Sequence, residues 1–240
     1  MSYLIPVGAS CLRPALGLLL ICITTSSIAS PPAVEDTGVA AAGECFVESS
    51  VVRTSGLRVV SAAPACGLGA GLELTLERQV QSGSPSRGQT AAVLKWSPES
   101  LSLKAGATEL SWGAWLATAR AKEADGVAKA AESSVALITS VKPSPELSLH
   151  VHLGVVRPQS SDPWSRLTHA ALYWSPISAV QWFAEMQTFA RRDLMGEPVV
   201  AAGARVWVIP DRLGVFVRTQ KASDRPSAWS LGLGWYPPAL

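Results

Sequence analysis

Apolar and polar residues alternate with a period of two along most of the chain after Glu44, and turn-forming residues interrupt the alternation about every ten residues. The clearest example is residues 199–220, where two predicted strands flank a short turn at residues 210–212. Valine and alanine fill one face of both strands, whereas the other face carries Arg205, Trp207 and Arg218. Because the alternation of period two is typical of strands, the fold class is predicted to be all-β. The apolar face of these strands must meet either a protein core or lipid.

The same pattern predicts about twelve strands, with ten as the lower count. An even number of this size is typical of closed antiparallel up-and-down transmembrane β-barrels. The strands are expected at residues 44–53, 57–64, 71–80, 90–98, 108–120, 133–141, 146–156, 167–176, 179–190, 199–209, 213–220 and 227–236.

The amino terminus resembles an export signal. A short apolar run at residues 15–23 follows Arg13 and precedes the small-residue site at Ala29, so residues 1–29 are predicted to be a cleaved signal peptide. The alternative, a membrane anchor, requires about 20 apolar residues. The bulky Ile21 before Cys22 argues against a lipoprotein site. Residues 30–43 are expected to be a flexible leader, residues 44–236 the barrel and residues 237–240 a short tail.

Two cysteines, Cys45 and Cys66, remain after removal of the signal peptide. Cysteines of exported proteins are usually paired. Cys45 begins the first predicted strand and Cys66 follows the second, so a hairpin brings both to the same end. A Cys45–Cys66 disulfide is predicted.

Lengths of the predicted connections alternate. Residues 142–145, 175–178 and 210–212 are short links, with residues 97–107 as an exception. Longer polar connections are expected at residues 81–89, 121–132, 158–166, 191–197 and 221–226. Outer-membrane barrels have short periplasmic turns and longer external loops.

Tryptophans gather near the short-turn ends of the predicted strands and on their apolar face. Such placement is typical of an aromatic belt at the lipid boundary. The alternative is that they anchor the core of a periplasmic sandwich or lipocalin-like barrel. The predicted belt consists of Trp96, Trp112, Trp174, Trp182 and Trp235.

The other face of the strands is rich in charged and polar residues. In a closed barrel this face must line the lumen, where opposite charges on neighbouring strands pair. Structural networks are favoured over a substrate path because small barrels are often filled by their own side chains. The predicted lumen-facing residues include Glu73, Lys95, His150, His152, Glu185, Arg205 and Arg218.

From Glu44 to its end the chain resembles a family of small proteobacterial outer-membrane β-barrel proteins, described as transporter-like or as outer-membrane components of phenol meta-pathway operons. The matching stretches are residues 44–49, 64–66, 72–76, 149–154 and 202–212. The resemblance implies a barrel in the bacterial outer membrane, with lipid and the barrel-assembly machinery as partners and an unknown small-molecule cargo. Such barrels usually end on an aromatic residue, whereas residues 237–240 follow Tyr236 here. If this tail blocks recognition by the assembly machinery, assembly is expected to depend on residues 232–236.

Enzymatic chemistry finds little support in the sequence. Outer-membrane lipid hydrolases place His-x-Ser on the lipid-facing side of a strand, whereas here Ser148 precedes His150 on the predicted luminal face, and the chain has no asparagine. No Cys/His/Asp spacing completes a metal site with His150, His152 and His169. We therefore predict no enzyme, no metal and no cofactor.

Composition fits this interpretation. Only 16% of residues are charged and 48% are hydrophobic, and the net charge of +2 is not clustered, so nucleic acid is not expected as a partner. The predicted function is a narrow porin-like conduit or small-molecule transporter. The alternatives are a closed structural or adhesive barrel acting through its external loops, and a periplasmic β-sandwich or lipocalin-like binding protein.

Overall fold

The computed structural model describes residues 37–82, 87–122, 128–157, 163–191, 194–195, 198–222 and 226–237. Among these residues no helix is long and apolar enough to span a membrane. The elements are β1 (Cys45–Thr54), β2 (Leu57–Gly69), β3 (Leu72–Ser82), β4 (Arg87–Trp96), the 3-10 turn η1 (Glu99–Leu101), β5 (Ser102–Ala105), β6 (Thr108–Lys122), β7 (Ala128–Ser144), β8 (Leu147–Arg157), β9 (Ser165–Ile177), β10 (Val180–Arg191), β11 (Leu194–Met195), β12 (Val199–Ile209), β13 (Leu213–Ala222) and β14 (Ala228–Trp235).

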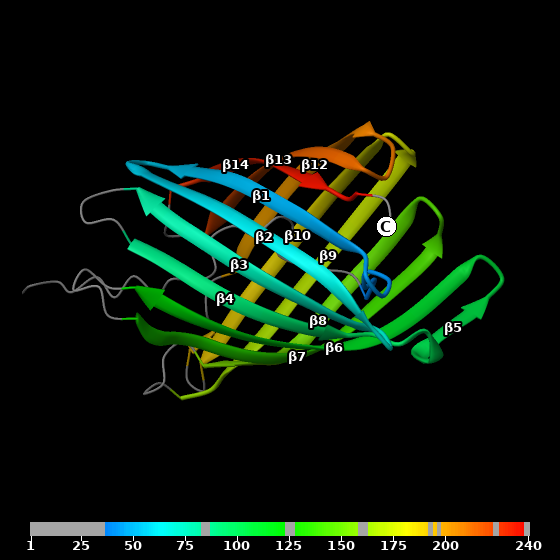
Figure 1. Cartoon of the computed structure of the whole chain (residues 1–240), viewed down its shortest axis with the longest axis horizontal. Coiled ribbons are helices and arrows are strands. Elements are labelled where there is room, and N and C mark those ends of the chain that lie inside the picture. Colours follow the sequence, from blue (N-terminus) through cyan, green and yellow to red (C-terminus); the bar gives the residue numbers. More distant parts are fainter. Residues whose placement is uncertain are drawn as a thin grey trace, which may run out of the picture.

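Twelve of these strands close into one antiparallel barrel (Figure 1). The closure is the pairing of β14 with β1, which runs from Val47 opposite Trp235 to Arg53 opposite Trp229. The short strands β5 and β11 lie outside the ring and pair only with β6 and β10. The predicted closed barrel of about twelve strands is confirmed, and the sandwich alternative is not what the chain forms.

The wall carries large apolar side chains on its outer face, whereas its inner face holds charged and polar side chains together with apolar ones such as Ile138 and Phe216. Leu116, Leu137 and Leu153, on neighbouring strands, are each more than half exposed on the outer face. Buried positions include Glu73 and His150, at 3% and 2% exposure. This distribution is the reverse of a soluble domain, where apolar side chains are withdrawn from the surface. It follows from the period of two, because successive side chains of a strand point to opposite faces.

The first and last described segments, residues 37–44 and 236–237, lie at one end of the barrel, called here the terminal end (Figure 1). Tight turns join the strands there, at residues 70–71, 145–146, 178–179 and 210–212. In the first, Ala70 and Gly71 have φ of 52° and 73°. Positive φ at both central residues is the requirement of the type I′ hairpin turn, whose twist matches that of the flanking strands.

Several element bounds differ from the sequence prediction. β2 continues past Pro64 to Gly69, and its ladder with β3 has no bridge at Pro64, whose nitrogen carries no hydrogen. β7 begins at Ala128, inside the predicted loop 121–132, because strand pairing with β6 continues beyond the apolar stretch. The exceptional connection 97–107 contains η1 and β5, which extends β6 as a hairpin at the terminal end.

Some predicted segments fall outside the described residues. The signal peptide, residues 1–29, is one of them, as is most of the tail 237–240, of which Pro237 is described. The structure describes residues 37–43 of the predicted leader.

An arginine placed on the outer face tests whether that face meets lipid. Leu137→Arg, near the middle of β7, is expected to lower the free energy of unfolding by about 2–4 kcal/mol, because the guanidinium would lie in hydrocarbon. Urea unfolding of the barrel refolded in lipid vesicles measures the change. Leu103→Arg, on β5 outside the ring, is the control and should cost about 0–1 kcal/mol. Equal small effects at both positions would mean that water covers the outer face.

Candidate functional site

The lumen is the candidate functional site, because the strand alternation directs most charged residues of the wall into it. Among the seven predicted lumen-facing residues, Arg205 is partly exposed and six are buried to 5% exposure or less. Those six are Glu73, Lys95, His150, His152, Glu185 and Arg218.

A cavity of about 660 Å³ occupies the lumen. Its lining begins at the terminal end with Glu44 and Tyr236 and extends to Gln89, near the start of β4, and to Gln187 on β10. The cavity therefore follows most of the strand length. Its volume lies within the range of small-molecule sites.

One ion pair on the cavity wall joins neighbouring strands. Lys95 Nζ on β4 lies 3.4 Å from Glu73 Oε1 on β3, and the two residues are directly opposite in the ladder. Glu73 Oε2 also accepts a hydrogen bond of 2.8 Å from the backbone nitrogen of Ala40. Both oxygens of this buried carboxylate are therefore engaged, which offsets the cost of removing the charge from water.

A second cluster closes the seam of the barrel from inside. Arg205 Nη2 on β12 lies 3.1 Å from Glu48 Oε1 on β1, and the hydroxyl of Tyr236 donates to the same carboxylate oxygen. The Arg205 guanidinium lies 5.5 Å from the ring centre of Trp207, and the Tyr236 ring stacks on Phe46. The side-chain contacts of this cluster therefore link β1, β12 and the segment after β14.

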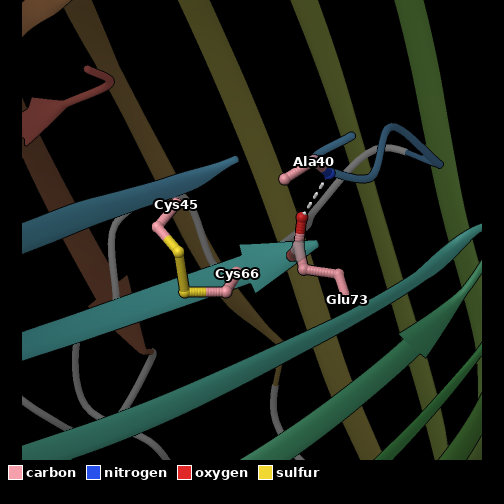
Figure 2. Close-up of a disulfide and its surroundings, with 4 residues drawn as sticks. All are labelled: Ala40, Cys45, Cys66 and Glu73. Carbon is pink, nitrogen blue, oxygen red and sulfur yellow. Dashed lines mark hydrogen bonds between the residues drawn. A yellow bond between two sulfur atoms is a disulfide. The ribbon is translucent and has the colours of Figure 1, made fainter. Parts of the chain in front are cut away.

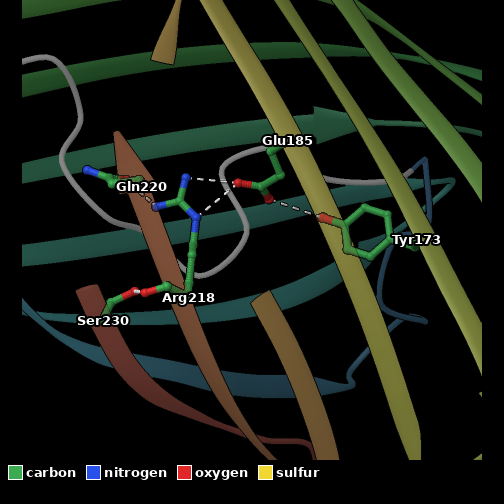
Figure 3. A network of polar contacts seen from close by, with 5 residues as sticks. All are labelled: Tyr173, Glu185, Arg218, Gln220 and Ser230. Atoms are coloured by element: carbon green, nitrogen blue, oxygen red, sulfur yellow. Dashed lines mark hydrogen bonds and ion pairs between the residues drawn. The ribbon is translucent and has the colours of Figure 1, made fainter. Parts of the chain in front are cut away.

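The third cluster fills part of the lumen, and its Arg218–Glu185 ion pair does not line the cavity. Arg218 on β13 contacts Glu185 on β10 through Nη2 at 2.8 Å and Nε at 3.0 Å (Figure 3). The Tyr173 hydroxyl donates to the other carboxylate oxygen, and Arg218 also donates to Gln220. The ion pair spans β12, which lies between β10 and β13 in the sheet.

The luminal histidines lie in two different environments. His150 Nδ1 is 2.7 Å from Ser140 Oγ, and its Nε2 is 2.9 Å from Ser148 Oγ. His152 lies beside His169, with 5.8 Å between ring centres. No group of three or more His, Cys, Asp or Glu residues in the described ranges is arranged to hold a metal ion.

An acidic row crosses the cavity wall and was not predicted. Glu77 on β3 lies opposite Ala91, Ala91 opposite Ala119, and Ala119 opposite Glu132 on β7. All four residues line the cavity. The sequence assigned Glu132 to a loop, although continuing the alternation back from Ser134 would have placed it on the luminal face.

The predicted Cys45–Cys66 disulfide is confirmed (Figure 2). The two residues are directly opposite in the β1–β2 ladder, with 4.1 Å between Cα atoms. Cys45 is exposed and borders the cavity at its terminal end, and Cys66 is partly buried. The bond therefore lies at the terminal end, where β1 begins.

The five tryptophans of the predicted belt all lie on the outer face near the terminal end. Four are exposed by 43–53%, and Trp112 is partly buried. Trp174 and Trp182 face each other across the β9–β10 ladder. The exposed four are Trp96, Trp174, Trp182 and Trp235.

Solved structures with the same architecture include outer-membrane porins. A KdgM porin in complex with disordered oligogalacturonate matches with a TM-score of 0.60 and 8% identity, covering 80% of this chain and 99% of that chain. A NanC porin matches with a TM-score of 0.55 and 8% identity, covering 80% and 100%. No protein-family model matches the sequence, and no curated protein matches it. The chain has the fold of the outer-membrane β-barrel proteins.

The comparisons correct the prediction that the chain is no enzyme. Outer membrane phospholipase A from Escherichia coli also matches, with a TM-score of 0.54 and 7% identity, covering 80% of this chain and 92% of that chain. The prediction rested on the order of Ser148 and His150 and on the missing asparagine, whereas an enzyme and porins share this architecture. At such low identity the likeness describes the fold and specifies no activity.

Removing one partner of the buried Arg218–Glu185 ion pair tests the role of that pair in stability. Arg218→Met is expected to lower the free energy of unfolding by about 3–5 kcal/mol, because Glu185 would remain buried without its cation. Combining Arg218→Met with Glu185→Leu should restore most of the loss. Lys104→Met, which breaks an exposed pair of 3.8 Å with Glu109, is the matched control and should cost less than about 1 kcal/mol. A double variant as unstable as the single one would contradict this account.

The disulfide gives a second test. Mass spectrometry without reductant should find the peptides of Cys45 and Cys66 joined. Reduction should lower the free energy of unfolding by about 3 kcal/mol, because the bond restricts the unfolded chain. Recovery of two free thiols from the native protein would contradict the assignment.

Proposed function

We propose that the chain is a narrow conduit in the bacterial outer membrane that admits small hydrophilic solutes and prefers cations to anions. The observation that carries the proposal is the charged cavity running along the lumen of a closed barrel with an apolar outer face. An outer-membrane barrel with a polar, unfilled interior is the architecture of a porin. The lipid and the barrel-assembly machinery are its proposed partners.

The preference for cations rests on the charges of the cavity lining. The described lining residues include six carboxylates and three cationic groups. Two of the three cations form ion pairs, Lys95 with Glu73 and Arg205 with Glu48. A low-dielectric lumen with an excess of one sign of charge concentrates ions of the other sign. The carboxylates are Glu44, Glu48, Glu73, Glu77, Glu132 and Glu146, and the cations are Lys95, Lys142 and Arg205.

The contrast with a structural neighbour sharpens the proposal. The KdgM porin was solved with oligogalacturonate, a chain of acidic sugars. The acidic row of Glu77 and Glu132 would repel such a polyanion. A small cationic or neutral solute is therefore the proposed cargo class.

A second candidate is a closed structural or adhesive barrel that acts through its external loops. This candidate is supported by the side chains that fill part of the lumen, above all the buried Arg218–Glu185 pair. The two candidates differ in whether ions pass.

Recordings in planar lipid bilayers distinguish the candidates. A folded barrel, verified by its heat-modifiable migration on a gel, should produce discrete conductance steps. Its reversal potential in a KCl gradient should show selectivity for potassium. A folded barrel that stays silent would contradict the conduit and favour the structural barrel.

The acidic row provides the selectivity test. Glu77→Gln combined with Glu132→Gln should reduce the cation-to-anion permeability ratio by about two- to threefold, because two of the six lining carboxyl groups can no longer carry negative charge. Glu99→Gln, on the exposed turn η1, is the control and should leave the ratio unchanged. An unchanged ratio in the double variant would mean that these carboxylates do not face the path.

A further inference from the structure

Residues 37–43, called here the plug segment, lie against the inner wall at the terminal end of the lumen. Thr37 is buried to 6% exposure, and Gly38, Val39 and Ala40 line the cavity together with the wall residues. The segment comes directly before Glu44 and the first residue of β1. It therefore reduces the free cross-section of the cavity at the terminal end.

Three strands of the wall bind the segment through hydrogen bonds. The Thr37 backbone nitrogen donates to Ser140 Oγ on β7 at 2.9 Å, and Thr37 Oγ1 lies 2.5 Å from Ser111 Oγ on β6. The Ala40 nitrogen donates to Glu73 on β3 (Figure 2). The partners at β3 and at β6 and β7 belong to different parts of the wall, so the segment extends across the inner surface.

A fourth strand accommodates the backbone of the segment. Gly43 donates to the carbonyl of Gly67 on β2, and Ala42 and Gly67 form a parallel bridge. A Cβ atom at Gly67 would lie 2.2 Å from the carbonyl oxygens of both Ala40 and Ala41. Only glycine permits this approach, which makes Gly67 the position on which docking of the segment depends.

The segment is fixed at one end and held weakly along the rest. The Cys45–Cys66 disulfide ties the start of β1 to β2 immediately beyond it. The hydrogen bonds of the segment to Ser140, Ser111, Glu73 and Gly67 each make a modest net contribution of about 0.5–1.5 kcal/mol. Its residues from Gly38 to Gly43 have small side chains apart from Val39. Such a segment can leave the wall without disrupting the barrel.

We infer that the plug segment gates the opening of the lumen at the terminal end. When the segment is docked on the wall, it restricts passage. When the segment leaves the wall, it opens the conduit, while the Cys45–Cys66 disulfide keeps its end beside β1 in place. The inference rests on the proposed conduit. Docking is a property of the structure that can be tested separately from conduction.

A designed cross-link tests docking and holds the gate closed. Thr37→Cys combined with Ser111→Cys places two sulfur atoms where hydroxyl oxygens now lie 2.5 Å apart. Mild oxidation should join them in most of the folded molecules, detected by mass spectrometry of the linked peptides. Each single variant is a control for thiol reactivity. Failure of the folded double variant to cross-link would overturn the docked position.

A variant that should release the plug segment from the wall tests the gate. Gly67→Ala should displace the segment and raise the unitary conductance about twofold or more, because the mouth widens. Gly214→Ala is the matched control at the same end of the lumen, where the added Cβ comes no closer than 3.2 Å to side-chain atoms, and it should conduct as the wild type does. The cross-linked double variant should not exceed the wild type.

The outcomes separate the gate from the conduit. Equal conductance of the wild type, the cross-linked variant and Gly67→Ala would overturn the gate and leave the conduit standing. Silence of every folded variant, Gly67→Ala included, would overturn both. Heat-modifiable migration verifies that each variant has folded.

Discussion

Pairing between β14 and β1 converts a twisted sheet into a closed wall, and the remaining features depend on that closure. An open sheet would present two rows of unpaired backbone groups, which hydrocarbon cannot solvate. Closure gives every strand of the ring two neighbours and separates an inside from an outside. The period of two in the sequence then sorts side chains between these surroundings, so Leu116, Leu137 and Leu153 face outward and Glu73, His150 and Arg218 face inward.

Charges placed inside a narrow barrel need partners, and the lumen provides them in two ways. Arg218 and Glu185 are almost fully buried and bond to each other and to neighbouring polar groups. Glu73 and Lys95 instead pair on the wall of the cavity. The first arrangement links strands that are not neighbours in the sheet, and the second places a charged pair beside the cavity. Porins and a phospholipase share this architecture, so the fold alone does not select between transport and catalysis.

The sequence predicts most of the fold because the barrel wall is a local pattern repeated. Alternation alone assigns Glu73, Arg205 and Arg218 to the lumen and Trp174 to the outer face, since a side chain's face depends only on its strand. Contacts between distant residues are different. Nothing near Thr37 in the sequence indicates that it meets Ser111 and Ser140. Nor does the charge-rich stretch around Glu132 reveal that pairing with β6 continues through it. The disulfide was predictable because both cysteines belong to one hairpin.

The cluster of Glu48, Arg205 and Tyr236 has a consequence for how the chain reaches its native state. The contact between Glu48 and Tyr236 joins residues 188 positions apart, and that between Glu48 and Arg205 joins residues 157 positions apart. Hairpins form from neighbours, but this cluster assembles only when the last strand meets the first. Loop-closure entropy is lost before such contacts compensate for it, which makes folding slow. We therefore expect the contacts of Tyr236 to form late in assembly, when β14 pairs with β1 and after the individual hairpins have formed.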